Sequence, residues 1–380
     1  MTIVGAITSL EQWLDRHQWR AWEPHDGLNT PLRRLAGNNR TLLLALKQIV
    51  LRSPWNLRPL LGIRAATSPE ARGFFARGYL RLYAALGDER FRLRAVEMLD
   101  RLHEDAERGY SGACWGNKFD YITRFFYLPA GTPIVVWTAH NAHAYVDAYE
   151  QLGDRKYLDI ARSAAEFILR DLPRHHENGT ECISYVPIGD HPVHNANVLG
   201  ASLLARVGKI TGEEELIATA KRAIAYTAAH QRSDGSWWYG EAENLRWVDN
   251  FHTGYVLESM QIYRDASGDH YFDESLRRGF EYYEKTFFED DGMPRYFSDK
   301  AFPADIQCAA QSIETLRMFD RVEHARRVAE WTLENLRDRD GYFYFRRHKR
   351  LVSRTPLLHW GQATMFSALA GLLENQEVPS

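Results

Sequence analysis

WVDNFHTGYVLESMQIY, residues 247–263, begins with polar side chains and continues as an apolar helix. Its polar opening contains Asp249, Asn250 and His252. The same order, a polar opening before an apolar helix rich in small residues, recurs at His140, His194, Asp305 and His359. Successive openings are 54, 55, 56 and 54 residues apart. A period of this size indicates a tandem array of similar supersecondary units.

Each unit has the same internal order. A tight turn containing glycine ends the first helix, as at Gly153, Gly212 and Gly268, because glycine readily adopts the left-handed conformation of a helix end. A more amphipathic helix follows and leads into a loop rich in glycine and aromatic residues: DGSWWYG (234–240), DGMPRYF (291–297) and DGYFYFR (340–346). An earlier unit spans residues 68–104. The first helices are thus predicted to open near residues 69, 140, 194, 250, 305 and 359.

Six such helical hairpins can close into a ring, with the small-residue helices inside. The sequence therefore predicts an all-α fold, an (α/α)6 toroid or six-hairpin barrel, with short aromatic β-hairpin-like loops on one face. An open superhelix of helix pairs is the alternative. A helix at about 9–19 or 40–51 would supply the sixth outer helix. Residues 1–64 would close the ring, residues 65–375 would form the repeat toroid, and residues 1–380 would be a single domain.

In a closed ring the long loops share one end with the start of every inner helix, so the polar openings would surround one central mouth. Basic residues lie in or beside the same loops: Lys118, Arg124, Arg295, Arg346 and Arg347. Aromatic walls with amides, carboxylates and cations suit a saccharide, and the basic groups favour an acidic one. The residues expected to bind it are Asn141, Asn195, Asn250, Trp238, Tyr239, Arg295, Tyr296, Gln307, His359, Trp360 and Gln362.

Two chemistries fit these residues. In hydrolysis, Asp249 and Asp305 would be the acid and base on either side of a glycosidic bond, and their separation would set inversion or retention. In epimerisation or β-elimination, a histidine or tyrosine would take a proton beside a carbonyl or carboxylate, and an arginine would neutralise that carboxylate. The candidate bases are His140, His194, His252, His359 and Tyr255.

Simpler explanations exist for each residue type. Aspartate and asparagine at a helix start are often only N-caps, although capping does not favour the histidines at three of the openings. A histidine on an apolar face is often a satisfied core residue. The aromatic residues of the loops can pack as wedges between outer helices, and Trp237, Phe343 and Phe345 are the strongest candidates for that role.

Composition narrows the function class. The formal net charge of the whole chain is −3, which gives no general attraction to nucleic acid or to an anionic membrane. No stretch approaches the roughly 20 apolar residues of a membrane span, so direct membrane insertion is not expected. The three cysteines are scattered, which favours a reducing, cytoplasmic location over a disulfide framework, and no metal-binding spacing occurs. No metal or cofactor is expected, and the sequence leaves the oligomeric state open.

Several blocks resemble known families. The repeat pattern is similar to the α/α-toroid enzymes, which include six-hairpin glycosidases, N-acylglucosamine 2-epimerases, unsaturated glucuronyl hydrolases and polysaccharide lyases. Residues 231–260, 290–316 and 341–347, with WGNKFDY (115–121) and LHWGQATM (358–365), resemble the VpsJ-type polysaccharide-biosynthesis proteins over about residues 65–375. This resemblance implies a role near polysaccharide assembly and implies no particular reaction. Gln307 stands where a histidine is expected from that family.

These observations favour a carbohydrate-active enzyme that acts on an acidic, uronate-type saccharide in polysaccharide synthesis or modification. A non-catalytic saccharide-binding or scaffold component of an assembly complex is the alternative, and a barrel that merely packs is a third. The arrangement at the mouth separates them. Open, facing carboxylates favour hydrolysis, whereas carboxylates buried as caps beside open histidines favour epimerisation or elimination.

Overall fold

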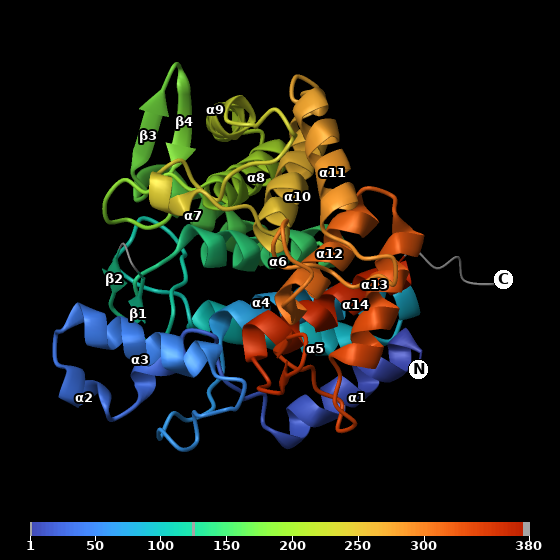
Figure 1. Ribbon diagram of the computed structural model, residues 1–380. Helices are drawn as coiled ribbons and strands as arrows, with labels where there is room; N and C mark the ends of the chain where they lie inside the picture. The colour runs from blue at the N-terminus through green and yellow to red at the C-terminus, as the bar shows by residue number, and fades with distance from the viewer. Residues whose placement is uncertain (1, 124–125, 375–380) are drawn as a thin grey trace.

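Paired antiparallel helices make up most of the molecule (Figure 1). The computed structural model describes residues 2–123 and 126–374, so Arg124 lies outside the described residues. The inner helices are α4 (Pro69–Leu86), α6 (Val135–Leu152), α8 (His194–Thr211), α10 (Asn250–Ser267), α12 (Ile306–Met318) and α14 (Thr364–Glu374). The outer helices are α5 (Glu89–Glu104), α7 (Arg155–Arg170), α9 (Glu214–Ala229), α11 (Asp273–Thr286) and α13 (Val322–Asn335).

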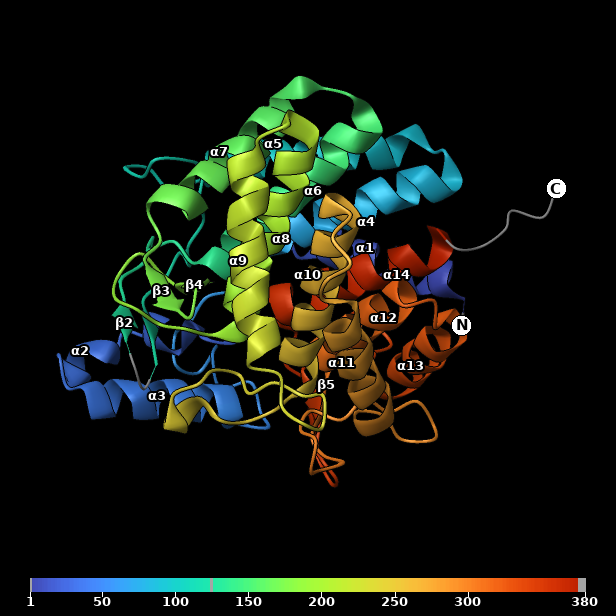
Figure 2. The same ribbon diagram turned by 90° about the horizontal axis from the view of Figure 1, so that it is seen from above.

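The inner helices form a closed ring. Each packs against the next along the chain, and α14 packs against both α12 and α4, so the last inner helix meets the first. Figures 1 and 2 show this closure as the red α14 beside the blue-green α4. The predicted α/α toroid is therefore confirmed, and the open superhelix is excluded.

The N-terminal helix α1 (Ile3–Arg16) occupies the sixth outer position, where it packs against α14. The Arg16 guanidinium donates to the carbonyl of Asp340 at 3.0 Å, and the Arg337 guanidinium donates to Ser9 Oγ at 2.6 Å. Gly341, at φ +108°, lies so close that an added Cβ would stand 2.3 Å from the Ser9 carbonyl oxygen. These contacts between the two ends of the chain support the proposal that it folds as one domain.

Four inner helices share one length. The helices α4, α6, α8 and α10 each span 18 residues and end at a glycine with φ between +68° and +76°. Residues at equal distances from these ends therefore lie at one level of the barrel. Arg77, His143, Ser202 and Glu258 share the ninth level, and a 3.0 Å hydrogen bond joins His143 Nε2 to Ser202 Oγ.

This register corrects the placement of His140. The sequence pattern put His140 at a helix opening, but α6 begins at Val135, so the histidine lies in the second turn. A loop covers the true opening, because the Val135 N–H donates to the Tyr185 carbonyl at 3.1 Å and needs no polar cap. His140 is level with Phe74 and Tyr255, at ring-centroid distances of 5.0 and 4.9 Å.

The loops at the mouth carry short antiparallel hairpins. These pair β1 (Tyr121–Ile122) with β2 (Tyr127–Leu128), β3 (Arg174–Glu177) with β4 (Thr180–Ile183), and β6 (Arg346–Arg347) with both β5 (Ala304–Asp305) and β7 (Val352–Ser353). The register of the last sheet places Asp305 opposite Arg346. His359 lies in a π-helical turn, Leu358–Ala363, that leads into α14.

Residues 26–64 form a separate layer beside the mouth. They include a 3-10 turn (Asp26–Asn29), α2 (Arg33–Ala36) and α3 (Arg40–Arg52). α3 lies next to β1, and Figures 1 and 2 both show it at one side of the barrel. No helix within residues 2–123 and 126–374 is both long enough and apolar enough to cross a bilayer.

Candidate functional site

A cavity of about 1180 Å³ lies where the inner helices begin, between the mouth loops and α3. Its aromatic lining includes Tyr121, Phe126, Trp137, Tyr185, Tyr239, Trp247, Phe251, Tyr255, Tyr296, Phe297, Phe345 and Trp360. Its polar lining includes His25, Lys47, Gln48, Arg52, Asp190, His191, Asn195, His252, Gln307, Arg346 and His348. Eight residues predicted from the sequence thus meet here: Asn195, Tyr239, His252, Tyr255, Tyr296, Gln307, Arg346 and Trp360.

The start of α10 builds an aspartate–histidine pair. Asp249 is the N-cap of α10, and its Oδ1 accepts the backbone N–H of His252 at 3.0 Å. Its Oδ2 lies 2.7 Å from His252 Nδ1 and accepts the Trp247 indole N–H at 2.9 Å. Asp249 is therefore buried and fully used by three donors, while the His252 ring lines the cavity.

The bond to Asp249 sets the proton on His252. A carboxylate only accepts hydrogen bonds, so Nδ1 carries the hydrogen and Nε2 of the neutral ring keeps its lone pair. No hydrogen bond from Nε2 to another described residue is present. The ring is held between Phe251 and Tyr239, at centroid distances of 3.9 and 4.5 Å. The arrangement is that of an oriented general base facing a cavity.

The second predicted acid, Asp305, is placed differently. It caps α12, with Oδ1 accepting the Gln307 N–H at 2.8 Å, and its Oδ2 binds Arg346 Nε at 2.8 Å and Nη2 at 2.6 Å. The carboxylate is completely buried and does not line the cavity. Asp249 and Asp305 therefore do not face each other across an open cleft, and both have the geometry of buried caps.

Cations dominate the charged lining. Arg346 stands over the rings of Tyr296 and Phe345, with its guanidinium carbon 5.1 and 4.6 Å from their centroids. Arg52 and Lys47 line the opposite wall, and burial lowers the pKa of Lys47 to about 8. Among the described lining residues the one carboxylate is Asp190, whose Oδ2 lies 2.9 Å from His175 Nδ1.

Buried polar atoms without partners gather around the inner end of the cavity. Such atoms are rare in folded proteins, because an unmet hydrogen bond in the interior costs about 1–3 kcal/mol. Gln307 illustrates the pattern: its Nε2 donates to the Tyr255 hydroxyl at 2.5 Å, and its Oε1 has no described partner. The others include His25 Nδ1, Trp137 Nε1, His140 Nε2, both side-chain amide atoms of Asn141, Asn195 Oδ1, Ser353 Oγ and His359 Nε2.

A buried acidic cluster adjoins this group. His359 Nδ1 lies 3.7 Å from Glu23 Oε2, and its ring centroid is 4.6 Å from that of Trp137. Burial raises the pKa of Glu23 to about 8 and that of Glu70 to about 7, and it lowers the pKa of His359 to about 4. His359 is therefore neutral at neutral pH, with Nε2 unprotonated if Nδ1 carries the hydrogen.

Other predicted residues have structural partners instead. His194 binds Glu241 through Nε2 at 2.8 Å, and Asn250 accepts from the Tyr283 hydroxyl at 2.9 Å. Gln362 bonds both backbone groups of Phe343. Two more predicted residues lie outside the cavity lining, namely Arg295, which pairs with Glu289, and Trp238, which packs under Arg232.

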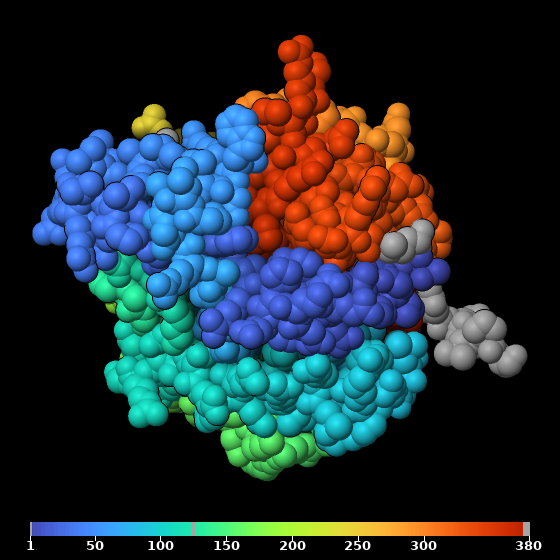
Figure 3. Space-filling view, turned by 90° about the horizontal axis from the view of Figure 1, so that it is seen from below, coloured from blue at the N-terminus to red at the C-terminus, as the bar shows by residue number. Residues whose placement is uncertain are grey.

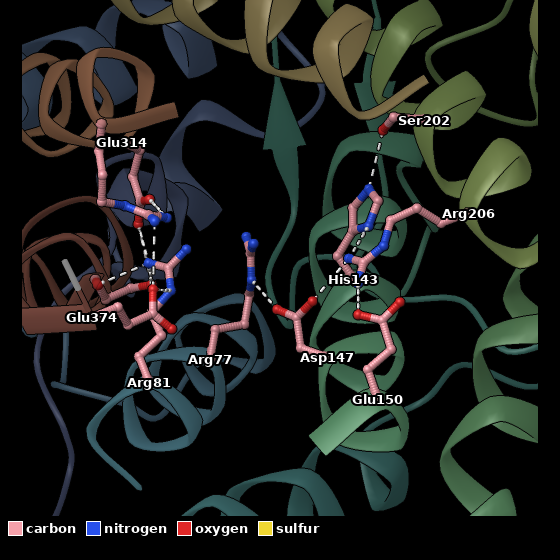
Figure 4. Close-up of polar contacts among 11 residues, drawn as sticks. Arg77, Arg81, His143, Asp147, Glu150, Ser202, Arg206, Glu314 and Glu374 are labelled. Atoms are coloured by element: carbon pink, nitrogen blue, oxygen red, sulfur yellow. Dashed lines mark hydrogen bonds and ion pairs between the residues drawn. The ribbon is translucent and has the colours of Figure 1, made fainter. Parts of the chain in front are cut away.

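The end of the barrel opposite the mouth, which we call the closed end, holds a dense ionic network (Figure 4). Asp147 accepts from Arg77 Nε and from Arg206 Nη1, each at 2.8 Å, and Arg206 Nη2 donates to Glu150 at 2.7 Å. Burial by itself raises the pKa of Asp147. The two arginines lower it by more, so the pKa lies well below its usual range. Arg81 similarly contacts Glu314, Glu374 and Ser367.

The repeat pattern does not predict the wall that α3 forms. Leu44, Gln48 and Leu51 of this helix line the cavity, together with His25 and Lys47. These residues lie outside the repeat, so its period could not reveal them. A signal was present nonetheless, because residues 27–69 contain no aspartate or glutamate.

No cluster of three or more histidine, cysteine, aspartate or glutamate side chains suited to a metal ion occurs in the described part of the chain.

Solved structures resemble this molecule, whereas no protein-family profile and no curated protein matches its sequence. Cellobiose 2-epimerase from Bacillus thermoamylovorans B4167 superimposes with a TM-score of 0.63 at 12% identity, covering 81% of this chain and 90% of that one. The chain is an α/α toroid. An unsaturated glucuronyl hydrolase specific for heparin gives 0.59 at 16% identity, with 82% and 87% covered. A family 76 glycoside hydrolase (mannosidase) from Bacteroides thetaiotaomicron VPI-5482 gives 0.55 at 11%, with 81% and 86% covered. At these identities the likeness concerns the fold.

Proposed function

We propose that this protein is a carbohydrate-active enzyme that uses His252 to take a proton from a carbon next to a carboxylate of an acidic saccharide. The observation that carries the proposal is the Asp249–His252 pair, in which Nδ1 is bound at 2.7 Å and the His252 ring lines the cavity. The similar solved structures act on sugars as epimerases, isomerases and hydrolases, which supports the class of substrate.

The lining fits a saccharide. Aromatic faces pack against the C–H faces of pyranose rings, and amides and imidazoles bind hydroxyl groups. Tyr239, stacked on Trp247 at 4.5 Å, and Tyr296 and Trp360 supply the faces. We assign Asn195 and Gln307 to hydroxyl recognition, since each has an unpartnered oxygen at the cavity.

The charges favour an acidic saccharide. Arg346, Arg52 and Lys47 line the cavity, and the buried carboxylate of Asp305 occupies Nε and Nη2 of Arg346. The remaining face of that guanidinium can bind a second carboxylate, the pairing in which arginine excels. An arginine bound to a substrate carboxylate also stabilises the negative charge that develops when the adjacent C–H loses its proton.

Proton abstraction fits the geometry better than hydrolysis by two carboxylates. Hydrolysis needs two carboxyl groups on opposite sides of the bond, about 5–9.5 Å apart. Asp249 and Asp305 are both occupied by helix caps and side-chain donors, and Asp190 is the one carboxylate in the described lining. Open histidines beside buried acids are the pattern of a carbon-acid reaction.

Two outcomes follow from one abstraction. In epimerisation, His252 Nε2 removes the proton and a group on the other face, for which we name the Tyr255 hydroxyl, returns one. In β-elimination, the carbanion expels the glycosidic oxygen, which takes up the proton that His252 removed and leaves as the alcohol, while a carbon–carbon double bond forms. His140 is buried about one helical turn deeper in the barrel than His252, beside Tyr255, and we propose that it positions the Tyr255 ring.

We further propose a place in cytoplasmic polysaccharide synthesis or modification, as the resemblance to VpsJ-type proteins implies. Cys114, Cys182 and Cys308 are all buried free thiols, which suits a reducing compartment.

The test is turnover of uronate-containing oligosaccharides in D₂O. Epimerisation places deuterium on the epimerised carbon, elimination produces an absorbing unsaturated uronate, and hydrolysis yields reducing ends alone. We expect His252→Gln to abolish deuterium uptake or elimination. The matched control is His270→Gln. Like His252, His270 binds an aspartate three residues away in the sequence, at 2.8 Å, but it lies on the surface.

Hydrolysis with no deuterium uptake would refute the proposed chemistry. Tight binding without any conversion would instead favour a non-catalytic saccharide-binding role.

A further inference from the structure

The segment 27–69 differs in charge from the rest of the chain. It holds Arg33, Arg34, Arg40, Lys47, Arg52, Arg58 and Arg64, and no aspartate or glutamate. The segment therefore carries a formal charge of +7, while the remaining residues carry −10 of the total of −3. The modest net charge of the whole protein hides a strongly basic region.

The same segment exposes apolar side chains. Leu35 is 83% exposed, Trp55 72% and Leu60 84%. Leu32, Leu42 and Ile49 are exposed as well, so six of the fourteen large hydrophobic side chains exposed in the described residues lie in this short stretch. Figure 3 shows it as a blue to light-blue lobe at one side of the molecule. Exposed apolar groups gathered in this way mark an interaction site.

Helix α3 has a second apolar face. Its inner face, Leu43 and Val50, is buried, and Leu43 packs against Leu28 and Ile122. The outward positions Leu42 and Ile49 lie two helical turns apart and are also apolar, although a helix on a protein surface normally presents polar residues there. No described element covers this stripe.

We propose that segment 27–69 binds the surface of an anionic phospholipid bilayer. Leucine, isoleucine and tryptophan enter the boundary between headgroups and acyl chains, and arginines bind the lipid phosphates. Arg34, Arg40 and Arg64 are exposed and form no ion pair with another described residue. A nucleic acid would match the charge but would leave the leucines in water, whereas an anionic bilayer satisfies both features.

The position of α3 gives this binding a consequence. The helix that carries the outer stripe also forms one wall of the cavity, through Leu44, Gln48 and Leu51. A protein bound through this segment therefore holds its cavity beside the lipid surface, within reach of a saccharide attached there. The binding itself does not depend on the proposed chemistry and can be measured without a substrate.

The experiment is flotation of the full chain with vesicles of phosphatidylcholine alone or with about a quarter phosphatidylglycerol. We expect binding to the anionic vesicles at low salt and its loss in high salt. Each arginine near such a surface contributes about fivefold to partitioning, so Arg34→Gln with Arg40→Gln and Arg64→Gln should weaken binding about 100-fold. Leu35→Ser with Ile49→Ser and Trp55→Ser should also abolish it.

Matched controls lie elsewhere on the surface. Tyr271→Ser and Ile188→Ser remove side chains that are 82% and 60% exposed, and Arg155→Gln removes an exposed charge. These variants should bind as the parent does, and unchanged melting temperatures should show that all variants are folded. The proposal is overturned if anionic vesicles do not bind the parent protein or bind segment and control variants equally. It is also overturned if the parent protein is a dimer that binds no vesicles and the serine variants are monomers.

Discussion

The two ends of the barrel axis use polar side chains in opposite ways. At the closed end, Asp147 is surrounded by Arg77 and Arg206, and every one of these groups has a charged partner (Figure 4). At the mouth, His252 Nε2 has no described partner, and Gln307 Oε1 is buried without one. Paired polar groups stabilise the ring, whereas spare hydrogen-bonding capacity is found at the end where we propose that a saccharide binds.

The largest expected effect concerns Asp249, whose carboxylate both caps α10 and orients the ring of His252. Asp249→Asn should lower kcat by about 10³–10⁴-fold, because the amide no longer fixes the proton of His252 on Nδ1. The melting temperature should change little, since asparagine caps a helix as well as aspartate does. The measurement is kcat beside the melting temperature, with Asp273→Asn, which holds the surface His270, as the control. Equal losses in both variants would contradict the assignment.

The next effect tests the closed end. Asp147→Ala leaves Arg77 buried without its anion and Arg206 with Glu150 alone, and it should cost about 3–5 kcal/mol of unfolding free energy in urea titrations. Arg277→Ala is the control, because it breaks ion pairs of a solvent-exposed side chain on α11 and should change the unfolding free energy far less. A small loss for Asp147→Ala would mean that the network is not what stabilises this end.

A third change removes charge at the mouth without leaving a buried ion. Asp305→Asn combined with Arg346→Gln deletes both members of the pair, and the cap is retained. The KM for a uronate substrate should rise about 10- to 100-fold, the worth of one charged hydrogen bond, while a neutral saccharide should be unaffected. Arg295→Gln with Glu289→Gln removes a comparable pair outside the cavity and should leave KM unchanged. An equal rise for neutral sugars would point to a distorted loop.

The smallest effect is a pH dependence of stability. Burial raises the pKa of Glu23 to about 8, so the folded protein keeps a proton that the unfolded chain has lost above pH ~4.5. Stability from this group is complete below the unfolded pKa and declines as pH rises toward 8. His359, with its pKa lowered to about 4, acts in the opposite direction only up to pH ~6.5.

Between pH 6.5 and 8.5 the unfolding free energy should therefore fall by about 1–2 kcal/mol more in the parent than in Glu23→Gln. Urea titrations across this range give the comparison, and parallel curves would contradict the raised pKa.

The repeat made the closed ring predictable, because a constant interval with constant internal order left few alternatives. It could not give the depth of each side chain. His140 matched the 54-residue interval, yet it lies in the second turn, because a loop carbonyl rather than a polar residue satisfies the start of α6. The pairing of Asp305 with Arg346 depends on two strands 41 residues apart, which no local pattern reveals.

The equal lengths of α4, α6, α8 and α10 restrict how this protein can diverge. One residue inserted into α6 would turn everything beyond it by about 100° and advance it about 1.5 Å. His143 and Asp147 would then miss Ser202 and Arg206. Loops, by contrast, tolerate added residues at small entropic cost. New substrate preferences in such barrels should therefore arise through mouth loops and the N-terminal layer, while inner-helix lengths stay constant.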